Sequence, residues 1–116
     1  MKLLAIALLA LLAGCATPQS PSESVFQAKT AHAVALRSAV AYRELPPCAK
    51  APQPCRDPAI VAQLQKADKV ADAALDSAEN AVRTPGFGQA VISSAITAAQ
   101  AALAAFVSIT DTLRSR

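Results

Sequence analysis

Two proline-containing interruptions separate three alanine-rich segments that could each form a helix of similar length. The first reads PPCAKAPQPC at residues 46–55, and the second reads TPGFG at residues 84–88. Proline lacks the backbone donor and clashes with the preceding turn, so neither stretch continues a helix. Alanine is the strongest helix former, which favours an all-α fold. Helices are expected at about residues 21–45, 58–83 and 88–113.

Both of the first two helices begin with a capping signal. Ser20-Pro21-Ser22-Glu23 predicts a capping box, with Ser20 as N-cap and Glu23 returning to the cap amide. Asp57 followed by Pro58 predicts the second start. In the first helix the apolar positions form an untidy stripe that includes Val25, Phe26, Ala33, Leu36, Val40 and Tyr42.

The second helix has the clearest amphipathic pattern. Its seam steps by fours and threes through Ile60, Leu64, Ala67, Ala71, Ala74, Ala78 and Ala81. The opposite face is charged and expected to face water, with Glu79 and Arg83 as a favourable i,i+4 pair. A short connection at residues 84–88 favours antiparallel neighbours. These features predict an up-down-up three-helix bundle; the alternative is an open pair of hairpins that completes its core in an oligomer.

The first fifteen residues have the features of an export signal. Lys2 is followed by an apolar run from Leu3 to Gly14, which is short of the ~20 residues that span a bilayer. The ending Leu12-Ala13-Gly14-Cys15 resembles the lipobox of bacterial lipoproteins. An ordinary signal peptide or an uncleaved anchor is the alternative.

The lipoprotein resemblance implies a cellular location and a covalent modification. It implies removal of residues 1–14 as a signal peptide, acyl lipid on Cys15, a tether over residues 15–20 and a folded domain over residues 21–116. Ala16 follows the cysteine where Asp commonly signals inner-membrane retention. The expected location is therefore the inner leaflet of the outer membrane, with the domain facing the periplasm.

The other two cysteines, Cys48 and Cys55, are expected to form a disulfide. An exported protein meets an oxidising compartment, and the eight-residue ring would stabilise the fold by about 2–3 kcal/mol. The functional alternative is a redox or metal-binding pair. Six intervening residues do not match the CxxC spacing, and no histidine or acidic cluster lies nearby in the sequence.

The third helix is unusual because no residue between Arg83 and Asp111 is charged. The twenty residues from Ala90 to Ile109 raise the alternative of a membrane span, which the central polar residues and the many alanines oppose. Two partner helices cover only part of a helix that is apolar around most of its circumference. Its uncovered side is either an alanine surface that water tolerates or a surface that contacts a partner. The candidate partner-face residues are Ile92, Ile96, Leu103, Phe106 and Val107.

The chain carries little that indicates catalysis. His32 is the only histidine, and it is expected to be a surface or packing residue. Asp68, Asp72 and Asp76 share a helical face, which is more typical of a solvated surface than of a cation site. We therefore expect no enzyme, no metal and no cofactor apart from the acyl lipid. A formal net charge of +3 and 3% aromatic residues likewise argue against nucleic acid, and no small-molecule substrate is expected.

The leading functional interpretation is a structural or adaptor lipoprotein of the outer membrane. The plan is similar to that of small helical envelope lipoproteins in its tether and helical character. Its expected partners are the membrane, through the lipid, and either a second copy or a larger envelope protein. The alternatives are a phage- or toxin-type lysis lipoprotein and a bundle that binds a small apolar ligand in its core.

Overall fold

The computed structural model describes residues 20–49 and 53–114. The expected signal peptide, Cys15 and residues 16–19 of the expected tether lie outside the described residues. The described part contains three helices, α2 (Pro21–Arg43), α3 (Pro58–Arg83) and α4 (Gln89–Arg114).

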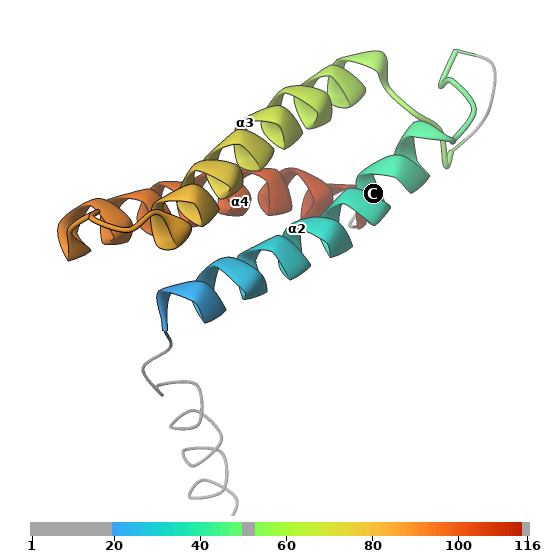
Figure 1. Cartoon of the computed structure of the whole chain (residues 1–116). Helices are drawn as coiled ribbons and strands as arrows, with labels where there is room; N and C mark the ends of the chain where they lie inside the picture. Colours follow the sequence, from blue (N-terminus) through green and yellow to red (C-terminus); the bar gives the residue numbers. More distant parts are fainter. Residues whose placement is uncertain (1–19, 50–52, 115–116) are drawn as a thin grey trace, which may run out of the picture.

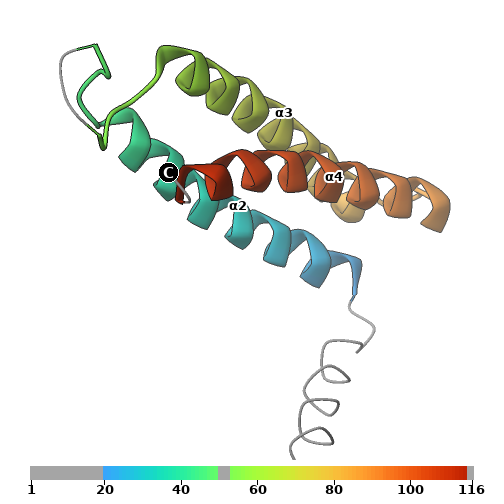
Figure 2. The same cartoon turned by 180° about the vertical axis from the view of Figure 1, so that it is seen from behind.

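The three helices run up-down-up, and each one packs against the other two (Figure 1). Figure 2 shows from behind that α4 lies along both α2 and α3, with its end beside the later part of α2. The predicted all-α antiparallel bundle is therefore confirmed. The first helix ends at Arg43, two residues before the expected position.

The predicted N-caps are present at both sites. The Glu23 amide donates to Ser20 Oγ at 3.2 Å, and the Ser20 amide donates to Glu23 Oε2 at 3.0 Å, which completes the capping box. The Asp57 carboxylate accepts from the Ala59 amide at 2.8 Å. Between α3 and α4, Gly86 adopts a φ of 94°, a left-handed conformation that glycine tolerates best.

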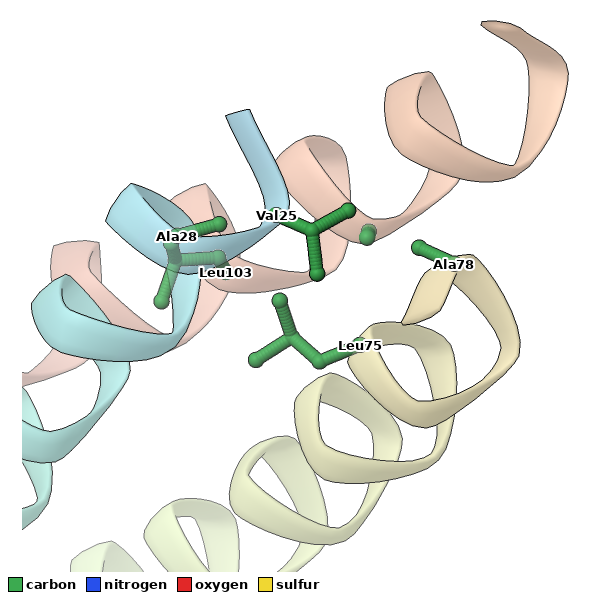
Figure 3. Close-up of a cluster of buried hydrophobic side chains, with 6 residues drawn as sticks. Val25, Ala28, Leu75, Ala78 and Leu103 are labelled. Carbon is green, nitrogen blue, oxygen red and sulfur yellow. The ribbon is translucent and has the colours of Figure 1, made fainter. Parts of the chain in front are cut away.

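One cluster of buried side chains lies toward the end where α2 begins (Figure 3). Val25 on α2 and Leu75 on α3 point toward one another, and Leu103 comes from α4. The expected seam of α3 did not include Leu75, whose side chain is only 1% exposed. The buried members of this cluster are Val25, Ala28, Leu75, Ala78, Ala99 and Leu103.

A second cluster surrounds Phe106, which is fully buried. Its buried members are Ala35, Ala39, Leu64, Ala71 and Phe106. The buried positions of α2 differ from the apolar stripe predicted for the first helix. Phe26, which belonged to that stripe, is 72% exposed. Small residues occupy the inward positions because they allow the helix axes to approach closely. These inward positions repeat at heptad-like intervals through Val25, Ala28, His32, Ala35 and Ala39.

Phe106→Ala tests how far the core depends on its largest side chain. We expect the free energy of unfolding to fall by about 3–5 kcal/mol, because the substitution removes buried apolar area and leaves a cavity. Val70→Ala is the control, since Val70 is 55% exposed on α3, and its effect should stay within about 0.5 kcal/mol. Urea denaturation followed by circular dichroism measures both. Equal effects would contradict the described core.

Candidate functional site

The disulfide predicted in the loop between α2 and α3 is present. Cys48 and Cys55 are bonded, with their Cα atoms 4.8 Å apart. The loop is also held by backbone bonds from the Cys48 amide to the Arg56 carbonyl at 3.1 Å and from the Arg56 amide to the Pro46 carbonyl at 2.9 Å. With both sulfurs in one bond, neither is a thiolate that could bind metal.

Opening this disulfide should destabilise the bundle. For the double substitution Cys48→Ser and Cys55→Ser we expect the free energy of unfolding to fall by about 2–3 kcal/mol, because the unfolded chain loses a loop constraint. Urea midpoints of the oxidised protein, the reduced protein and the double variant provide the measurement. The reduced protein serves as a control for the two serine substitutions and should match the variant. A midpoint that does not change on reduction would show that the disulfide adds no stability.

His32 is buried at the junction of the three helices. Its Nε2 lies 2.8 Å from Asp68 Oδ1 on α3, and its ring meets the Phe106 ring of α4 edge-on with centroids 5.5 Å apart. Only 9% of the residue is exposed, which restricts access of a substrate from solvent. A neighbouring cavity of about 70 Å³, lined in part by Asp68, is well below the ~300 Å³ of typical ligand pockets. His32 is therefore a packing residue with a satisfied polar atom.

Three acidic residues of α3, Asp68, Asp76 and Glu79, contact side chains of α2. Asp68 binds His32, and Asp76 lies 3.4 Å from Lys29 Nζ on α2. This arrangement does not support a cation site at Asp68, Asp72 and Asp76, because two of these aspartates contact side chains of α2. In residues 20–49 and 53–114, no three His, Cys, Asp or Glu side chains come together as a metal site.

Glu79 connects two basic residues on different helices. It accepts a hydrogen bond from Lys29 of α2 and forms the predicted pair with Arg83 at 2.5 Å. The hydrogen bond from Lys29 is the main cause that lowers the pKa of the Glu79 carboxyl. The same hydrogen bond raises the pKa of Lys29. The expected charged face of α3 therefore turns partly toward α2 at this point.

These pKa shifts predict the direction of the pH dependence. A lowered Glu79 pKa stabilises the fold above its ordinary value of 4.5 and loses that contribution as the pH falls through the lowered value. The raised Lys29 pKa acts at the other extreme, where its contribution disappears as the pH rises above 10.5. Lys29→Met should therefore lose less stability than the parent protein when the pH falls below 4.5.

Urea midpoints between neutral and acidic pH measure this difference. Lys66→Met is the matched control, because Lys66 is exposed on α3 and belongs to none of the described ion pairs. The urea midpoint of this control should fall with acidic pH as steeply as that of the parent protein. If the Lys29→Met variant lost as much stability in acid as the parent protein, the contact between Lys29 and Glu79 would not govern the pH dependence of stability.

The structure corrects the predicted partner face of α4. Leu103 is only 9% exposed and Phe106 is fully buried, so both belong to the core of the monomer. Ile96 and Val107 are partly buried and pack against the same core clusters, while Ile92 is partly buried. The largest apolar side chains of α4 point inward because their burial removes the most surface from water.

The solvent side of α4 is lined instead by small and uncharged residues. We define the outer face of α4 as its exposed residues from Ser93 to Ser108. They are Ser93, Ser94, Thr97, Ala98, Gln100, Ala101, Ala104, Ala105 and Ser108. In length and composition, α4 would also suffice to cross a membrane.

Comparisons with known proteins add no relationship to this geometry. No protein-family model, no curated protein and no solved structure matches the chain.

Proposed function

We propose that this protein is a lipid-anchored envelope protein with a structural or adaptor role. Acylated Cys15 would hold it on the inner leaflet of the outer membrane, with the bundle in the periplasm. The outer face of α4 would contact a second copy of the chain or a larger envelope protein. The lipobox-like ending Leu12-Ala13-Gly14-Cys15 supports the anchor, and the Cys48–Cys55 disulfide fits an oxidising compartment.

The outer face of α4 is the observation that carries the adaptor role. It is exposed along the helix and has no charge. The exposed side of α3, in contrast, carries Lys66, Lys69 and Asp72. Alanine and serine side chains allow another helix to approach at the near end of the 8–10 Å range. A surface of this kind suits helix-to-helix contact better than it suits a small-molecule site.

A few fully covered side chains of α4 favour a bundle over a membrane span. Ala99, Phe106 and Thr110 are almost completely covered in the bundle, so withdrawing α4 into a bilayer would uncover the core faces of α2 and α3. The polar residues Ser93, Ser94 and Gln100 on the outer face would also need partners in hydrocarbon. Both effects oppose insertion of α4.

Site-specific photocrosslinking in intact cells tests this proposal. A photoreactive amino acid placed at Ala101, on the outer face of α4, should give a discrete larger adduct, because a partner would lie within reach of that side chain. Mass spectrometry of the adduct distinguishes a second copy from another envelope protein. The same purified material should show acyl lipid on Cys15 and no residues 1–14.

Ala73 provides the matched control for the crosslink. It is also an exposed alanine near the middle of a helix, but it lies on the charged side of α3. Its photoreactive variant should remain monomeric. Only monomer at both positions would contradict the adaptor role, and an intact Met1 would contradict the anchor.

A further inference from the structure

Three large apolar side chains are exposed toward the end of the bundle where α2 begins. Phe26 is 72% exposed, Phe87 48% and Val91 50%. Phe87 lies in the turn before α4 and Val91 in the first turn of α4. Both views place this turn and the start of α2 at the same end of the bundle (Figures 1 and 2).

Phe26 belongs to the same end, because it lines a shallow groove between α2 and α3 together with Arg83, in the last turn of α3. The chain has three phenylalanines, and the third, Phe106, is fully buried. Two of the three are therefore left in water toward one end of the molecule. Contact with an apolar medium would remove this surface from water.

The tether keeps this end close to the proposed anchor. It covers residues 15–20, and Ser20 is the N-cap of α2. A fully extended chain advances at most about 3.6 Å per residue, so Ser20 can be no more than about 18 Å from Cys15. The 23 residues of α2 then carry the disulfide loop about 35 Å farther along the helix axis.

The charged side chains at this end that carry the contacts already have partners within the chain. Glu79 binds Lys29 and Arg83, and the Glu23 carboxylate accepts from the Ser20 amide. Asp76 also lies 3.4 Å from Lys29 Nζ. These five side chains contribute two positive and three negative charges, so they offer no net attraction to an anionic surface. A lipid contact here would therefore depend on the apolar side chains.

From these observations we propose that the α2-start end of the bundle rests on the lipid surface and that Phe26, Phe87 and Val91 enter its interfacial layer. The proposal rests on the proposed function, because it requires the acyl anchor at Cys15. The occupant of this apolar end is the same leaflet that holds the anchor. The contact would orient the bundle, so that the disulfide loop faces away from the membrane.

Single tryptophans test this contact directly, because the chain contains none. Phe87→Trp and Phe26→Trp place the reporter at the proposed contact, and Val34→Trp is the control. Val34 is 53% exposed and lies about 20 Å along α2 from its first residue. Each variant, with acyl lipid on Cys15 and without residues 1–14, is incorporated into phosphatidylcholine vesicles, and its emission is measured with and without brominated acyl chains.

Brominated lipid should quench the Phe87→Trp and Phe26→Trp variants at least about twofold more than the Val34→Trp variant, because interfacial side chains lie about 5–10 Å deep. Vesicles that also contain phosphatidylglycerol should give the same ranking, since the contact is apolar. A ranking that appears only with phosphatidylglycerol would overturn the apolar contact.

Mass spectrometry of Cys15 in the same samples separates the two possible failures. Acylated protein with equal quenching at all three positions would overturn the contact and leave the proposed function standing. Protein without acyl lipid on Cys15 would overturn the proposed function and the contact together.

Discussion

Close packing of alanine-faced helices is the constraint on which the rest of this structure depends. Alanine at Ala35, Ala71 and Ala78 brings the helix axes together, but each side chain buries little apolar area. A few large residues, Phe106 and Leu75 above all, then supply much of the core. A small domain built in this way depends more strongly on its caps, its disulfide and its contacts between helices.

The same constraint explains the polar contacts inside and beside the core. His32 takes an inward position on α2, where its ring packs on Phe106 and its nitrogen meets Asp68. Lys29 lies about one turn before His32 on α2 and donates a hydrogen bond to Glu79 on α3. These two contacts select the register of α2 against α3, because a slip of one residue would bury a charge or separate both pairs.

Packing also gives α4 two different sides. Apart from the exposed Val91, its large apolar residues face α2 and α3, and its small uncharged residues face outward. The proposed adaptor role depends on the outward side, whereas the proposed lipid contact depends on the turn before α4 and the start of α2. The two surfaces share no residue, and the outer face of α4 lies farther along the helix than Val91.

The sequence by itself determined the three helices, their order and the two N-caps, because proline breaks, capping residues and alanine propensity are local effects. It also predicted the Cys48–Cys55 disulfide from spacing and compartment. Only the tertiary structure decided which side of each helix is buried. Almost all of α4 is uncharged, so its sequence does not show which side is buried. Leu103 and Phe106 were therefore predicted to lie on a partner face, although they lie in the core. The His32–Asp68 and Lys29–Glu79 pairs join residues far apart in the chain, and their proximity follows from helix register, which no local pattern specifies.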